Sequence, residues 1–136
     1  MWRVFCYIYS MMKTLRTSIF AGIYIGTAGF GFLTAGIQSQ YGSLFGSILF
    51  ALGLLAIVGY KLKLFTGTAG FVKKNEIGDL LIILLGNIIG CFMMGMLTRV
   101  SPVSDGIQVA ALNIMNTRME TGAIGCGLLA IGCGLL

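Results

Sequence analysis

The sequence has no histidine, one proline and only four acidic residues in 136 positions. Without histidine it lacks the side chain that most often acts as general base and as nitrogen ligand of zinc. Its four cysteines show no CxxC spacing, and in apolar stretches a thiol behaves as a small hydrophobic group. We therefore expect no enzyme, no metal site and no cofactor.

Charge is also scarce, at 10% of residues against about a quarter in soluble domains. No Asp, Glu, Lys or Arg occurs from Thr17 to Tyr60 or from Leu80 to Thr98. A helix needs about 20 apolar residues to cross a hydrocarbon core of about 30 Å. With a hydrophobic content of 57%, the chain is predicted to be an all-α integral membrane protein.

We predict one membrane domain over residues 1–136, in which the uncharged runs form the spans. Its parts are an interfacial lead-in at 1–16, span 1 at 17–37, a broken span 2 at 43–73, span 3 at 77–98 and span 4 at 121–136. Short helices are expected at about 67–73 and 107–115. The last span stops without a polar anchor, so we expect a chain that is truncated relative to its relatives.

The net charge of +5 bears on orientation in the membrane, and no nucleic-acid partner is expected. Basic residues precede the first span and lie between the second and third: Arg3, Lys13, Arg16, Lys73 and Lys74. By the positive-inside rule, the N-terminus and the loop at 73–79 are predicted to be cytoplasmic.

The segment from Gly59 to Phe71 is the most informative part of the chain. An apolar helix there meets Lys61 and Lys63, and a Leu-Phe-Thr-Gly turn follows. Irregular backbone at membrane depth persists only where protein or water satisfies it, so broken helices often mark a substrate path. Alternatively, the helix ends at Tyr60, both lysines snorkel to the headgroups, and the turn is an interfacial loop.

Three residues near this break have two interpretations each. Lys63 either snorkels or attracts anions from inside the bilayer, where an ionised group usually faces a cavity or a partner. Thr66 either donates into a pore or satisfies carbonyl groups that the break frees. Asn87, the only strongly polar residue between Leu80 and Met96, either makes an interhelical hydrogen bond, the simpler interpretation, or contacts an ion.

Pairs of glycines four residues apart occur in three predicted spans: Gly22 and Gly26, Gly42 and Gly46, and Gly86 and Gly90. Such spacing lets helix backbones approach closely. It predicts a tightly packed bundle that forms oligomers.

Several motifs, in this order and spacing, resemble the formate/nitrite transporter family. They are Ala21–Gly26, Phe50–Leu54, Leu64–Gly67, Gly86–Gly90 and Gly125–Gly127. The resemblance covers about residues 17–98 well and 121–136 loosely. Two features depart from the family pattern: the chain has no histidine and no fifth or sixth helix, and Lys63 stands where the family usually has an acidic residue.

The resemblance implies an aquaporin-like bundle, with about four spans present of a six-span inverted-repeat fold. It also implies a pentamer in a prokaryotic inner membrane, each copy with a pore for small monovalent anions such as formate, nitrite or hydrosulfide. The pore threonine would be Thr66, with Leu64 and Phe65 near the constriction, and Lys63 and Asn87 beside the path. The alternatives are a non-transporting structural or holin-like membrane protein and a compact four-span exporter.

Overall fold

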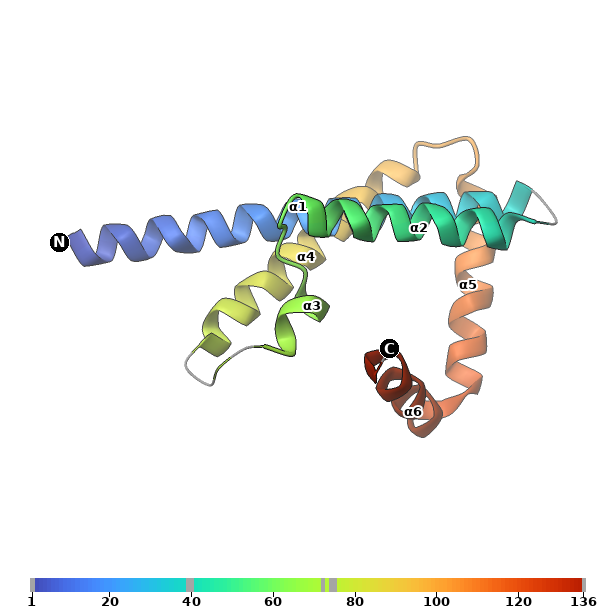
Figure 1. Cartoon of the computed structure of the whole chain (residues 1–136). Coiled ribbons are helices and arrows are strands. Elements are labelled where there is room, and N and C mark those ends of the chain that lie inside the picture. The colour runs from blue at the N-terminus through green and yellow to red at the C-terminus, as the bar shows by residue number, and fades with distance from the viewer. Residues whose placement is uncertain (1, 39–40, 72, 74–75, 136) are drawn as a thin grey trace.

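The computed structural model describes residues 2–38, 41–71, 73 and 76–135, and the regular structure in these ranges is helical (Figure 1). Six α-helices follow one another among the described residues: α1 (Trp2–Gln38), α2 (Gly42–Gly59), α3 (Phe65–Ala69), α4 (Ile77–Thr98), α5 (Ser104–Glu120) and α6 (Gly122–Leu135). Residues 39 and 40, between predicted spans 1 and 2, and Lys74 of the predicted loop at 73–79 lie outside the described residues.

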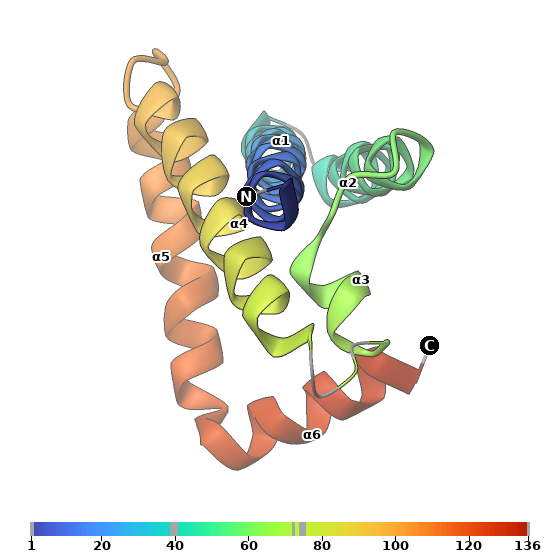
Figure 2. The same cartoon turned by 90° about the vertical axis from the view of Figure 1, so that its left-hand side faces the viewer.

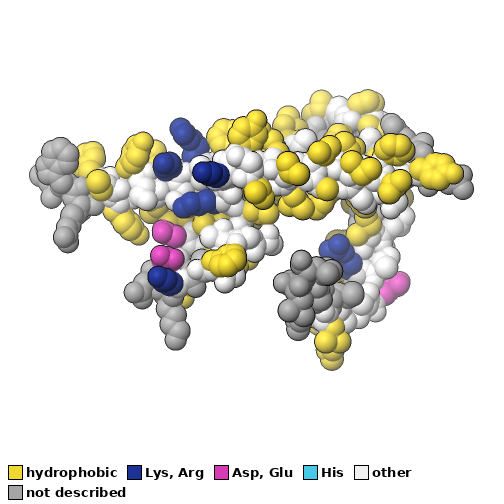
Figure 3. Space-filling view, in the orientation of Figure 1, with side chains coloured by type: hydrophobic (Ala, Val, Ile, Leu, Met, Phe, Trp, Pro, Cys, Tyr) yellow, Lys and Arg dark blue, Asp and Glu magenta, His cyan; other side chains and the backbone are white. Residues whose placement is uncertain are grey.

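In the part of the chain that the structure describes, three helices are long and apolar enough to cross a membrane: α2, α4 and the Phe5–Ile37 part of α1. Only 17 to 22% of their most apolar windows is buried within the chain, so most of their apolar side chains face outward. Figure 3 shows these hydrophobic side chains along α1 and α2. Such surfaces require lipid or other protein around them. The all-α membrane fold class is therefore confirmed.

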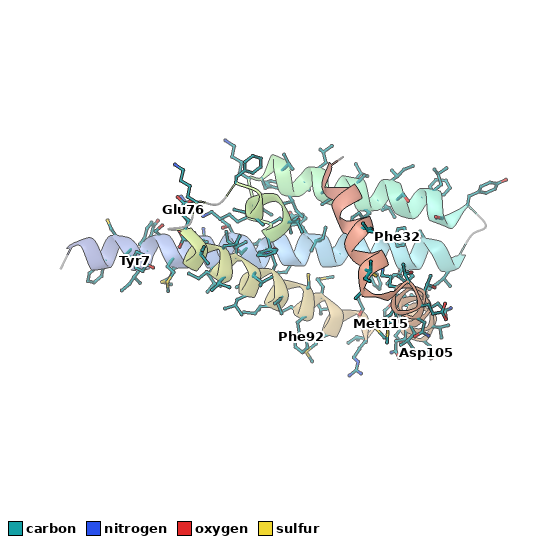
Figure 4. The ribbon with its side chains drawn as sticks, turned by 90° about the horizontal axis from the view of Figure 1, so that it is seen from below. Tyr7, Phe32, Glu76, Phe92, Asp105 and Met115 are labelled. Atoms are coloured by element: carbon teal, nitrogen blue, oxygen red, sulfur yellow. The ribbon has the colours of Figure 1, made fainter. Side chains whose placement is uncertain are left out.

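Helix α1 is the centre of the bundle, with α2 on one side and α4 on the other (Figures 2 and 4). Glycines make the α1–α4 contact close. A Cβ at Gly90 would collide with the Ile19 carbonyl oxygen, and one at Gly22 would collide with the backbone of Asn87. Backbone therefore packs against backbone here, which confirms the close-packing role predicted for these glycines.

The α1–α2 contact is built in the same way. A Cβ on three glycines of α2 would strike α1: Gly42 at Ala35, Gly46 at Phe32 and Gly53 at Ala28. With these three glycines facing it, α2 lies along the C-terminal half of α1. This packing carries the end of α2 to the middle of α1.

The lead-in expected at residues 1–16 is not a separate element, because the first helix runs from Trp2 to Gln38 without interruption. No proline or glycine stands before Gly22 to break it, and charges such as Lys13 and Arg16 do not disrupt helical hydrogen bonding. At about 1.5 Å per residue, α1 is about 55 Å long. Its first turns extend beyond the other helices (Figure 1).

The last two helices continue at the other end of the bundle. Helix α5 is longer than the segment expected at 107–115, and Gly106 meets Ile37 near the end of α1. Gly122, with φ 72°, turns the chain into α6, which has 14 residues and lies apart from α1 at the far end of α5 (Figures 1 and 2). Helix α6 is thus shorter than the three candidate spans.

Candidate functional site

Helix α2 ends in a Schellman motif. The Lys61 N–H donates to the Val58 carbonyl at 3.0 Å, and the Leu62 N–H donates to the Ile57 carbonyl at 3.0 Å. Lys61 has φ 52°, the left-handed conformation that such a motif requires and that glycine usually supplies. This geometry confirms a helix end next to Tyr60, as the sequence predicts.

A short stretch of irregular backbone follows before the chain becomes helical again. Leu64 is extended, with φ −93° and ψ 134°, and the five-residue helix α3 begins at Phe65. The sequence predicts this helix at 67–73, so it begins two residues earlier and ends at Ala69; Val72 lies outside the described residues. The hydroxyl of Thr68 donates to the Leu64 carbonyl at 2.6 Å, which stabilises the single turn.

Asn87 of α4 holds this break in place. Its Oδ1 accepts the Phe65 N–H at 2.8 Å, and its Nδ2 donates to the Lys63 carbonyl at 3.1 Å and to the Ser18 carbonyl at 2.8 Å. One buried amide therefore satisfies the backbone on both sides of the break and ties it to α1. The interhelical hydrogen bond that the sequence predicts for Asn87 is present.

The five residues predicted for the substrate path have different surroundings. Lys63 Nζ donates to Thr14 Oγ1 of α1 at 2.9 Å. Leu64 and Phe65 are half-buried, whereas Thr66 is exposed, and its hydroxyl makes no hydrogen bond with the described residues. Asn87 bonds the Lys63 carbonyl and Thr68 bonds the Leu64 carbonyl, so neither of these carbonyls depends on the Thr66 hydroxyl.

An open groove of about 490 Å³ lies between the end of α2 and α3. Its walls are mostly apolar, including Leu54, Ile57 and Leu64. The polar side chains that line it are those of Lys61, Thr66 and Thr68. Of the predicted path residues, only Leu64 and Thr66 line this groove, while Lys63, Phe65 and Asn87 form the support behind it.

The site lies near the middle of α4. Asn87 is ten residues after Ile77 and eleven before Thr98, or about 15 Å from each end. On α1 the same level is marked by Thr14 and Ser18. Basic side chains gather at this level, over α1 and the adjoining end of α2 (Figure 3). Helix α3 lies between that end of α2 and the first half of α4 (Figure 4).

Sequence reasoning missed Thr14, Ser18 and Thr68. A threonine four residues after Leu64 is the usual spacing for a hydroxyl that bonds a helical carbonyl, so Thr68 carried a local signal. Thr14 and Ser18 lie 49 and 69 positions from their partners, and no local signal marks them. Among the described residues, no group of three His, Cys, Asp or Glu side chains is placed to hold a metal ion.

The family model for formate/nitrite transporters matches residues 7–136. No curated protein and no solved structure matches the chain.

Proposed function

The chain belongs to the formate/nitrite transporter family, and from that premise we propose that it conducts a small monovalent anion, such as formate or nitrite, past the break between α2 and α3. The break itself carries this proposal. Its backbone is satisfied by an asparagine on a neighbouring helix, so it is stable without a regular helix, and a groove opens beside it.

The proposed path passes Leu64 and Thr66, with Phe65, Lys63 and Asn87 behind them. An apolar wall excludes a fully charged, hydrated ion because burying an unpaired charge is costly. The Thr66 hydroxyl, which makes no hydrogen bond with the described residues, replaces part of the lost hydration. An anion that is protonated to a neutral weak acid at the constriction loses its charge before it crosses, and its passage is then coupled to protons. Passage without this protonation is passive.

The proposal requires the break to lie within the bilayer. The central position of Asn87 in α4 supports this, since α4 has the length of a span and the break is hydrogen-bonded to its middle. Lys13 and Arg16 of α1 then lie at a similar depth. We propose that these charges face water in a vestibule or snorkel along α1.

The remaining family features are proposals of the same kind. We propose a pentamer of aquaporin-like protomers in a prokaryotic inner membrane, with the N-terminus in the cytoplasm. The outward-facing apolar side chains of α2, among them Leu44, Leu55 and Val58, supply surface for contact with lipid or with other copies.

Flux measurements test the function. The 136-residue chain is purified into liposomes, and uptake of formate and of nitrite is compared with that of empty liposomes. We expect saturable uptake of at least one of these anions, reduced by Thr66→Val, which removes the hydroxyl and keeps the shape. Uptake no faster than in empty liposomes would overturn the proposal.

The same liposomes distinguish an anion conduit from the main alternative, a holin-like or structural membrane protein. A holin-like protein would release a large dye such as calcein together with the anions, whereas a selective conduit retains the dye. A structural protein would release neither.

A further inference from the structure

Lys61 is the residue of the site whose backbone conformation is least usual. Its φ of 52° is the only positive φ of a non-glycine residue in the described ranges. The position is the one that glycine normally occupies after a helix, because a Cβ is disfavoured there. Glycine would complete the same pair of hydrogen bonds, so backbone geometry does not explain a lysine here.

Lys61 is one of the residues that line the groove. Its side chain makes no hydrogen bond and no ion pair with the described residues. Lys63 differs, because its ammonium group is held by Thr14 on α1 and it is not part of the groove wall. Proximity in sequence therefore does not make the two lysines equivalent.

Two of the polar residues that line this groove, Lys61 and Thr66, have side chains that make no hydrogen bond or ion pair with the described residues. The hydroxyl of the third, Thr68, is bonded to the Leu64 carbonyl. A cation and a hydroxyl donor within a mostly apolar wall are suited to a small anion with oxygen acceptors, and the apolar wall strengthens the attraction.

We propose that Lys61, together with Thr66, is the specificity-determining residue that draws a monovalent anion into the groove. This inference rests on the proposed function. It assigns to Lys61 the attraction of anions that was one interpretation of Lys63. Lys63 instead positions the break against α1 through Thr14.

The test exploits the left-handed backbone. Lys61→Gly removes the charge while retaining a residue suited to that conformation, so we expect an unchanged or higher Tm. In the nitrite uptake assay, we expect the half-saturating concentration to rise about tenfold or more, since local charge sets the concentration of an ion at a cleft. Raising the ionic strength should slow uptake by the wild-type chain more than uptake by the variant.

Lys61→Arg keeps the charge and should remain close to wild type, and Lys63→Gln should change the half-saturating concentration less than Lys61→Gly does. If Lys61→Gly does not fold, Lys61→Asn takes its place, because asparagine also tolerates this conformation. If the wild-type chain takes up nitrite and Lys61→Gly leaves this uptake unchanged, the role given to Lys61 would be overturned and the proposed function would stand. Equal losses in Lys61→Gly and Lys61→Arg would do the same. Absence of wild-type uptake would overturn the proposed function and this assignment with it.

Discussion

Replacing Asn87 by leucine is the most direct test of how the break is held. Leucine has nearly the same shape but neither donates nor accepts, so the variant removes three hydrogen bonds with little change in packing. The Ser18 carbonyl lies inside α1 and keeps its helical environment. The Phe65 N–H and the Lys63 carbonyl lose the side chain that bonds them.

The expected loss follows from these two groups. An unsatisfied buried backbone group costs about 1–3 kcal/mol. Hydrogen bonds between membrane helices contribute about 0.6 kcal/mol on average and up to about 1.7 kcal/mol. Since Phe65 is only half-buried, we expect Asn87→Leu to lower the free energy of unfolding by about 2–4 kcal/mol.

The measurement is reversible unfolding by SDS in mixed micelles, followed by circular dichroism and by thiol labelling of Cys91, whose S–H donates to the Gly22 carbonyl at 3.4 Å. Asn113→Leu is the matched control, because Asn113 is exposed on α5 and should change stability by less than about 0.5 kcal/mol. If the two variants were equally stable, the role assigned to Asn87 would be wrong.

Three further predictions concern packing, access and charge. Gly90→Ala should separate α1 from α4 and lower the Tm. Gly95→Ala, with open space around its Cβ, should raise helix stability by up to about 1 kcal/mol. Equal Tm values for the two variants would contradict this prediction. In a cysteine-free background, Thr66→Cys should react with a membrane-impermeant thiol reagent and lipid-facing Leu55→Cys should not, and an inert Thr66→Cys would argue against a water-filled groove. Lys63→Gln should lower the Tm by loosening the break from α1, while an unchanged Tm would show that the bond to Thr14 contributes nothing to stability.

The helices that could span a membrane were predictable because their signal is local. Uncharged runs between Thr17 and Tyr60 and between Leu80 and Thr98 set α2, α4 and the apolar part of α1. The end of α2 was also predictable, since two lysines and a turn motif follow it. The continuity of α1 is not predictable from the uncharged runs, because a charged residue limits transfer into lipid but does not end a helix.

The candidate site was less accessible to sequence reasoning. Its composition pointed to Thr66 and Asn87, but the partners of Asn87 lie 22 to 69 positions away, and only the packing of α4 on α1 brings them together. The different surroundings of Lys61 and Lys63 depend on the backbone turning left-handed at one residue and not at the other. Side-chain type alone does not encode that difference.

The hydrogen bonds of Asn87 also affect how the passage of anions is gated. Because the Asn87 amide, which is bonded to the Ser18 carbonyl of α1, also bonds the Phe65 N–H and the Lys63 carbonyl, swinging α3 outward would break these last two hydrogen bonds together. We therefore expect gating to come from rotamer changes of exposed side chains that line the groove, such as Leu54. Exposed side chains change rotamer within picoseconds to nanoseconds, so conductance would fluctuate far faster than in proteins gated by a moving domain.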